Sequence, residues 1–313
     1  MKHLLAFTLL LASPTMAAVK PDDVAAYRAL VDQDLRLAST GYGLAYANRS
    51  FCKNTQANAG FMVHDILQYP SVETARAAFG FVQPVSVSVI IPGGAAQVAG
   101  LQVGDGLVGL NDEKWDWSRA PGAKTYDRVA SVKSDIRARL ANFKDIALQI
   151  ERSGKRLTVI ITPTVTCVGD FQIDTVRGKD AGTDGNMISM SIGLARYATD
   201  RDEFAFIVAH ELSHNILGHR AQLESGKGKR AILATEIEAD RLSVWLMANA
   251  GYDPQGAVRF ALRCRKNSCL GLFSDATHLG LKKRADILMS EIALIRAAPK
   301  KDGLVTPPLL RRP

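Results

Sequence analysis

The sequence lacks several features that mark particular classes of protein. It has no repeat of fixed period and no long low-complexity tract, so we expect folded domains rather than extended disorder. Aromatic residues make up 7% of the chain and form no stripe with the basic residues. The net charge of +8 therefore predicts a solvated surface and no nucleic-acid partner. The 313 residues suffice for two domains, each with a hydrophobic core.

Long hydrophobic runs are absent except at the N-terminus. The apolar run 4–12 follows the charged Lys2 and precedes a cleavage point after Ala17 or Ala18. A membrane span needs about 20 apolar residues, so this run predicts a signal peptide over residues 1–17, with an uncleaved anchor or a buried helix as the alternative. A bacterial lipid anchor is not expected, because there is no cysteine at the cleavage point. We expect a soluble exported protein, periplasmic or secreted, with no integral membrane segment after cleavage.

Cysteine is scarce, with four residues in the chain: Cys52, Cys167, Cys264 and Cys269. An even number in an oxidising compartment predicts two disulfides. Three pairings are formally possible. We expect Cys52 to pair with Cys167, which would bracket one domain, and Cys264 to pair with Cys269, which would close a short loop.

The first part of the exported chain, residues 18–74, predicts a helical segment that packs on a later domain. Pro21 suits a first helical turn, and apolar residues recur at helical spacing as far as Leu37. The segment 40–58 is rich in glycine, asparagine and serine and predicts irregular structure.

Residues 75–164 predict a small β-rich domain. Valines alternate with serines from Val85 to Val89, a helix is expected over 126–140, and Ser153-Gly154 predicts a hairpin turn. The stretch PGGAAQVAGLQVGD, residues 92–105, followed by an alternating strand, resembles a PDZ domain.

The PDZ resemblance implies a peptide partner. PDZ domains bind an extended peptide, often a C-terminus, by adding it as a strand to an exposed sheet edge. The segment Phe79-Gly80-Phe81 resembles the carboxylate-binding loop of these domains, and core packing is an equal alternative for it. A domain of this type could also serve only to position the rest of the protein.

The third region, residues 165–298, predicts strands and then helices. The expected elements are strands over 171–176 and 187–192 and helices over 200–218, 231–250, 255–263 and 282–298. Residues 299–313 predict a flexible basic tail.

A metal-site motif lies on the first of these helices. His210 and His214 are separated by one turn, so both imidazoles can reach one tetrahedral Zn²⁺. Glu211 is rotated by about 100° on the helix, which keeps it off the metal and near a water held there. A carboxylate in that place can take the proton of the water as it attacks a carbonyl group.

The next helix supplies the rest of the expected site. Glu236 and Asp240 are also one turn apart and share a face. Glu236 is the expected third ligand, in a His, His, Glu set with one open position, which marks a catalytic site. Asp240 is expected to accept the free ring N–H of a ligand histidine, His210, and Glu238 to be solvated.

A different third ligand can be excluded from the spacing. A metzincin would need a histidine six residues after His214, where the chain has Arg220. His219 is one residue out of that register. We expect it to bind backbone carbonyls at the end of the helix.

The motifs HELSHNILGH and TEIEAD together resemble the HtpX/BepA-like gluzincin peptidases, which include the CAAX prenyl proteases, and most closely an exported bacterial type with a PDZ-like domain. The resemblance implies that His278 approaches the zinc and that Arg284 orients the site or steadies an oxyanion. It also implies a strand above the metal against which substrate aligns as a further strand. The matching strand residues are Met187, Ile188, Ser189, Met190, Ser191 and Ile192.

The resemblance departs from the family in two places. Leu279 stands where the family usually has proline, and the membrane helices of the HtpX-like members are absent from the sequence. We expect an α+β protein with a mostly helical peptidase domain. The PDZ-like domain is expected to be inserted between the N-terminal helical segment and this peptidase domain. The expected function is a zinc endopeptidase acting on unfolded or misassembled envelope proteins. The alternative is a peptide-binding or chaperone-like protein with a latent or inactive zinc site.

Overall fold

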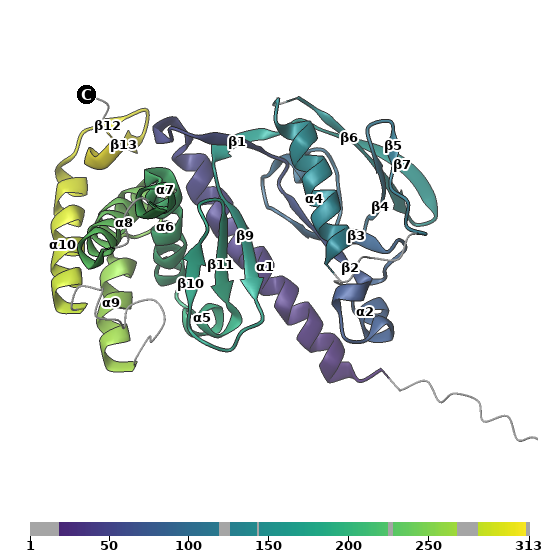
Figure 1. Ribbon diagram of the computed structural model, residues 1–313, viewed down its shortest axis with the longest axis horizontal. Helices are drawn as coiled ribbons and strands as arrows, with labels where there is room; N and C mark the ends of the chain where they lie inside the picture. The colour runs from purple at the N-terminus through teal and green to yellow at the C-terminus, as the bar shows by residue number, and fades with distance from the viewer. Residues whose placement is uncertain (1–18, 119–125, 143, 225–227, 268–280, 311–313) are drawn as a thin grey trace, which may run out of the picture.

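The computed structural model describes residues 19–118, 126–142, 144–224, 228–267 and 281–310, and these form the predicted α+β fold. Two lobes, each built around its own cluster of buried apolar side chains, lie on either side of a long helix, α1 (Figure 1). The β-rich lobe holds a six-stranded sheet, and the helical lobe holds most of the helices and a three-stranded sheet.

The β-rich lobe is an antiparallel sheet with strand order β2-β3-β4-β6-β7, and β5 pairs with β4. Its turn at Ser153-Gly154 has positive φ at both residues, 50° and 73°, and confirms the predicted hairpin. Its elements are β2 (Phe61–Asp65), η2 (Ile66–Gln68), α2 (Val72–Phe79), β3 (Val85–Ile90), α3 (Ala95–Val98), β4 (Gly106–Leu110), β5 (Glu113–Lys114), α4 (Asp127–Leu140), β6 (Ile146–Arg152) and β7 (Lys155–Ile161).

This sheet begins before residue 75, where the sequence places the boundary. The first strand, β2, pairs with β3 and so belongs to the β-rich lobe. Its last two residues are polar, which hides the strand from pattern analysis, yet both side chains make hydrogen bonds inside the protein. Asp65 is fully buried and binds Arg128 of α4 through both carboxylate oxygens, at 2.5 and 2.7 Å. His64 Nδ1 lies 2.8 Å from the Tyr69 hydroxyl.

Helix α1 (Pro21–Ala47) is longer than the predicted helix, which ends at Leu37. Gly41 and Gly43, two of the residues that suggested irregular structure, lie inside it, and Gly41 allows close packing. A Cβ atom at Gly41 would lie 2.2 Å from the ring of Phe171, so only glycine lets the helix contact that ring without a shift. Leu37 and Leu44 are buried on the same helix.

The same helix carries a half-buried carboxylate with a perturbed pKa. Asp34 accepts a hydrogen bond from the Ile173 backbone N–H at 2.9 Å. Burial raises the pKa of Asp34 from 3.8 to about 6, against the lowering effect of that hydrogen bond. The folded protein therefore binds more protons than the unfolded chain between these two values, and its stability falls as the pH rises through this window.

We expect Asp34→Asn to stabilise the protein above pH 6 by up to about 3 kcal/mol, because the amide keeps an acceptor for Ile173 and carries no charge. The gain should disappear below pH 4. Urea unfolding at pH 4 and pH 7.5 measures both values. Asp32→Asn, an exposed substitution on the same helix, is the matched control. A gain that is equal at both pH values would contradict this assignment.

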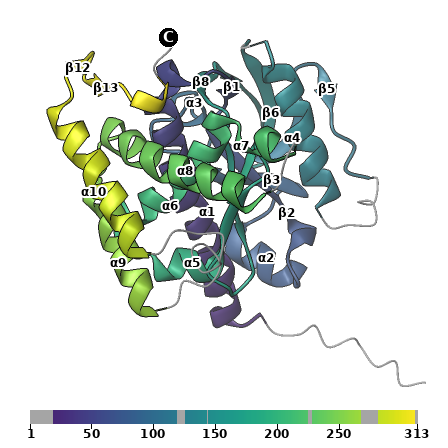
Figure 2. The same cartoon turned by 60° about the vertical axis from the view of Figure 1, so that its left-hand side comes forward.

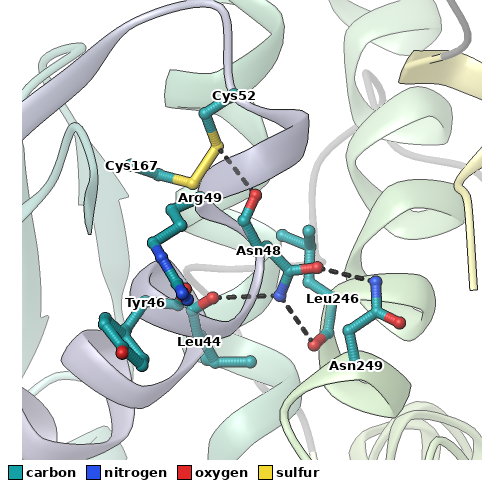
Figure 3. The surroundings of a disulfide bond; sticks show 8 residues. All are labelled: Leu44, Tyr46, Asn48, Arg49, Cys52, Cys167, Leu246 and Asn249. Carbon is teal, nitrogen blue, oxygen red and sulfur yellow. Dashed lines mark hydrogen bonds between the residues drawn. A yellow bond between two sulfur atoms is a disulfide. The ribbon is translucent and has the colours of Figure 1, made fainter. Parts of the chain in front are cut away.

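The predicted disulfide between Cys52 and Cys167 is present, with the two Cα atoms 5.6 Å apart. It lies where the chain leaves α1 through η1 (Arg49–Phe51) and where β8 (Thr164–Cys167) returns, antiparallel to β1 (Thr55–Asn58). Figure 3 shows the bond beside Asn48, whose carbonyl oxygen lies 3.5 Å from the Cys52 sulfur. Cys264 is also disulfide-bonded, and its predicted partner, Cys269, lies outside the described residues.

The C-terminal segment is not the free tail that the sequence suggests. Residues 300–305 form a hairpin of β12 (Lys300–Lys301) and β13 (Leu304–Val305), followed by η3 (Pro308–Leu310). Asp302 and Gly303 have φ values of 52° and 80°, as a tight hairpin turn requires. Asn249 binds both backbone polar groups of Val305, at 2.8 and 3.0 Å, and its side chain also donates to Asn48 (Figure 3).

The helical lobe packs helices around α6 (Figures 1 and 2). Its sheet has the order β10-β11-β9, with β11 parallel to β9 and antiparallel to β10. No helix among the described residues has the length and apolar character needed to cross a membrane. Its elements are β9 (Asp170–Asp174), β10 (Ala181–Thr183), β11 (Met187–Ser191), α5 (Ile192–Tyr197), α6 (Arg201–Leu217), α7 (His219–Glu224), α8 (Lys229–Asn249), α9 (Gln255–Asn267) and α10 (Leu281–Ala297).

Candidate metal centre

The two candidate histidine ligands lie on α6, in the middle of the helical core. The Asp200 side chain caps the start of this helix by accepting from the backbone N–H groups of Asp202 and Glu203. Gly218, with φ of 68°, ends it in the left-handed conformation. Both signals agree with the predicted helix. His210 is 2% exposed and His214 is one turn further on, so their imidazoles lie on one face.

The third candidate ligand comes from α8, which packs against α6 (Figure 2). Glu236 Oε2 lies 3.3 Å from His210 Nε2, and Glu236 Oε1 lies 3.5 Å from His214 Nε2. The two Nε2 atoms are 3.2 Å apart. The ligand atoms of these three residues all lie within 4.8 Å of one another, so the group could hold one metal ion, as the sequence predicts.

The charges of the site support a cation at this point. The carboxylates of Asp240 and Glu236 raise the pKa of His210 even though its burial opposes the charged form. Burial, together with the neighbouring His210, lowers the pKa of His214. The lone pairs of the two imidazoles and the negative charge of the Glu236 carboxylate therefore lie together at one place that favours a positive charge. A divalent cation there would satisfy both imidazole lone pairs and the carboxylate, so the donor set fits a metal.

The outer nitrogen of His210 is held as the sequence predicts. His210 Nδ1 lies 3.1 Å from Asp240 Oδ1, and both residues are 2% exposed. A carboxylate bonded to the far ring nitrogen fixes the tautomer that leaves Nε2 free for a metal. Arg284, on α10, is also 2% exposed and donates to the same Asp240 oxygen. Arg284 thus contacts the carboxylate behind His210.

Glu211, the candidate general base, is 5% exposed in the same core. Burial raises its pKa to about 7, while the charges of His210 and Glu236 act on it in opposite directions. Because a bound divalent cation favours the ionised form of a nearby carboxylate, the cation and the burial have opposing effects on this group. A base with a pKa near neutrality is suited to taking and returning a proton.

His219 occupies a different place from the one that the sequence predicts. It is 1% exposed and binds no backbone carbonyl in the described structure. Its Nδ1 lies 3.0 Å from His214 Nδ1, and its Nε2 lies 3.0 Å from Glu238 Oε2. Glu238 is therefore a partner of His219, although its side chain is 41% exposed. The sequence signal for this arrangement was the helix-ending Gly218, which turns the chain so that His219 faces back toward His214.

The proposed substrate strand must also be corrected. Residues 187–191 form β11, but β11 is the central strand of its sheet and pairs on both sides, so a further strand cannot add to it. Ile192 begins α5. Among the described strands of this sheet, the one toward α6 is β10, whose Thr183 hydroxyl lies 2.6 Å from Asn215 Oδ1. The edge strand of this sheet next to α6 is therefore β10, residues 181–183.

The segment Phe79-Gly80-Phe81 follows its packing alternative. Gly80 ends α2 in the left-handed conformation, with φ of 64°. The Phe79 and Phe81 rings lie 4.9 and 4.4 Å from the ring of His64, in a cluster with Tyr69. The Phe79 and Phe81 rings therefore pack in a small apolar cluster. The segment 79–81 does not lead into the edge strand β2. That strand is preceded by a turn in which Asn58 Oδ1 accepts from the Gly60 N–H at 2.8 Å.

His278, which the family resemblance assigns to the site, lies outside the described residues. The predicted signal peptide, residues 1–17, also lies outside them. Comparison of the chain with protein-family models and with curated proteins finds no match in either. The case for function is therefore carried by the residues and the geometry above.

Proposed function

We propose that the protein is an exported zinc-dependent endopeptidase. The observation that carries this proposal is the convergence of His210, His214 and Glu236, with the buried Glu211 beside them on the same helix. Two imidazoles and one carboxylate are the ligand set of catalytic zinc sites that keep a position open for water. When bound, zinc would supply Lewis acidity toward that water and toward the carbonyl oxygen of a peptide bond.

The chain's own groups would carry the proton. A Glu211 carboxylate oxygen would take a proton from the attacking water and give it to the leaving amine nitrogen. Asp240 and Arg284 would act from behind, by fixing the ring of His210. His210, Asp240 and Arg284 are each 2% exposed, and this burial strengthens the charge interactions among them.

The outer edge of β10, with which no described strand pairs, supports a polypeptide as the substrate. This edge lies beside α6, and an extended segment could pair with its backbone next to the metal. A substrate bound in this way must present an extended segment whose backbone N–H and C=O groups are free along one edge, as a locally unfolded chain does. This agrees with unfolded or misassembled envelope proteins as substrates.

The proposed location rests on two independent features. The N-terminal run 4–12 has the pattern of a signal peptide. The Cys52–Cys167 disulfide is of the kind that persists in oxidising compartments. Together they support a periplasmic or secreted protein.

Zinc analysis combined with a cleavage assay tests the proposal directly. We expect about one zinc per purified chain and cleavage of an unstructured protein such as casein, lost on treatment with a chelator and regained with zinc. Cleavage that persists after the metal is removed would overturn the assignment, and so would a protein that binds no divalent cation.

A cavity favours a second candidate function, peptide binding. It has a volume of about 450 Å³ and lies between β2 and α4 on one side and β9 with the start of β11 on the other. Its apolar lining includes Phe61, Ile136 and Leu140, and β2 is the edge strand of the six-stranded sheet. An extended peptide could pair with β2 and place side chains against α4. In this case the metal site would be latent or inactive.

The two candidate functions differ in a measurable way. A binding protein should retain a labelled unstructured peptide with a free C-terminus, lose affinity for it in Ile136→Glu, and show no cleavage at any zinc concentration. Cleavage that depends on zinc would reject the latent-site alternative. Ala130→Glu, further along the exposed face of the same helix, is a suitable control.

A further inference from the structure

The two candidate histidine ligands are supported from behind in different ways. The outer nitrogen of His210 meets the carboxylate of Asp240 directly, at 3.1 Å. The outer nitrogen of His214 meets another imidazole, that of His219, at 3.0 Å. The second nitrogen of His219 then meets Glu238 Oε2, also at 3.0 Å. A carboxylate therefore stands behind each ligand, and behind His214 it acts through an intervening ring.

The side chains of His214, His219 and Glu238 form a hydrogen-bonded row. When a metal is bound, only one placement of the ring hydrogens lets every contact in this row be a hydrogen bond. His214 Nε2 faces His210 Nε2 and Glu236, so it is the ligand atom and carries no hydrogen. A neutral His214 must then carry its hydrogen on Nδ1, where it donates to His219 Nδ1. His219 consequently carries its hydrogen on Nε2 and donates it to Glu238.

The fold builds this row from three helices. Gly218 adopts φ of 68° and reverses the chain at the end of α6, which brings His219, the first residue of α7, beneath His214. The two rings meet edge to face, with centroids 4.9 Å apart and planes at 78°. Glu238 lies on α8, two residues after the ligand Glu236. The helix that supplies the third ligand thus also supplies the end of the row.

We propose that His219 and Glu238 are positioning residues that fix the tautomer and ring plane of His214 and thereby set the affinity of the site for a divalent cation. His219 is the main contributor, because it is 1% exposed and touches the ligand itself. Glu238 contributes less, because it is 41% exposed and acts through His219. The inference rests on the metal site of the proposed function and does not require peptidase activity.

The decisive comparison is between His219→Gln and His219→Leu. A glutamine amide can accept from His214 with its oxygen and donate to Glu238 with its nitrogen, whereas leucine fills the volume and can do neither. We expect the zinc dissociation constant, measured by competition with a chromophoric chelator, to rise about 10- to 100-fold in His219→Leu. It should stay within a few-fold of wild type in His219→Gln.

Two further measurements separate orientation from a general loss of structure. The melting temperature of the metal-free protein shows whether each variant is folded. The visible absorption of bound Co²⁺ reports ligand geometry, and we expect it to change in His219→Leu and to return toward wild type in His219→Gln. Glu238→Leu should give a smaller loss of affinity of the same kind, and Glu224→Gln, on the exposed surface of α7, should give none.

Equal zinc affinities in wild type and a folded His219→Leu would overturn the inference and leave the proposed function intact. A glutamine variant as weak as the leucine variant would overturn it as well, because a hydrogen-bonding side chain would then have no advantage. A wild-type protein that binds no cation would instead refute the proposed function together with this inference.

Discussion

Glu211→Gln should lower the cleavage of an unstructured protein about 10²- to 10⁴-fold while the chain keeps its zinc. Glutamine has nearly the shape of glutamate but cannot accept the proton of the attacking water. The three candidate ligands are different residues, so their convergence is preserved. Initial rates of casein cleavage, taken with the zinc content of the same preparation, measure both parts of the prediction.

The control for this substitution should change an acid to an amide elsewhere. Glu73 is exposed on α2, in the β-rich lobe, and Glu73→Gln should cleave at the wild-type rate. A Glu211→Gln protein that turns over substrate like wild type would show that another group takes the proton. Loss of zinc in this variant would show that Glu211 also holds the metal site together.

Asp240→Ala should have the largest effect on stability, about 3–5 kcal/mol. Asp240 is 2% exposed and contacts both His210 and the guanidinium of Arg284, which is itself 2% exposed. Its removal takes a carboxylate away from a buried positive charge. Zinc affinity should fall about 10- to 100-fold at the same time, since His210 loses the group that orients it.

A double substitution separates these two effects. Asp240→Leu combined with Arg284→Met removes both buried charges and replaces them with apolar groups of similar volume. We expect it to recover much of the stability lost in Asp240→Ala, and not the zinc affinity. Guanidinium unfolding and chelator competition give the two values. If affinity returned together with stability, the role of Asp240 would be structural and not orienting.

The group of three residues that could hold a metal ion could be predicted from the sequence because its signals are local. Residues one turn apart on a helix share a face, so the pairs His210 with His214 and Glu236 with Asp240 fix their own geometry. The cap at Asp200 and the terminating Gly218 fix the bounds of the helix in the same way. The sequence does not show which faces meet, but acidic and imidazole groups on two apolar helices suggest that they do.

Two of the remaining errors share a physical cause, because they depend on contacts between distant segments. Helix α1 continues past Leu37 because Phe171 packs against Gly41, a contact across 130 residues that composition cannot reveal. β11 cannot receive a substrate strand because β10 and β9 already pair with it. The turn at Asp302-Gly303 was a local hairpin signal, hidden within a basic, proline-rich segment.

The pairing of β1 with β8 has a consequence for how such a protein could arise. The chain enters the β-rich lobe along β1 and leaves it along β8, and the disulfide joins the outer ends of this two-stranded stem. The segment between Cys52 and Cys167 is therefore an inserted unit whose two ends lie side by side. Such a unit can be gained, exchanged or deleted in evolution without rerouting the helices that surround the metal site.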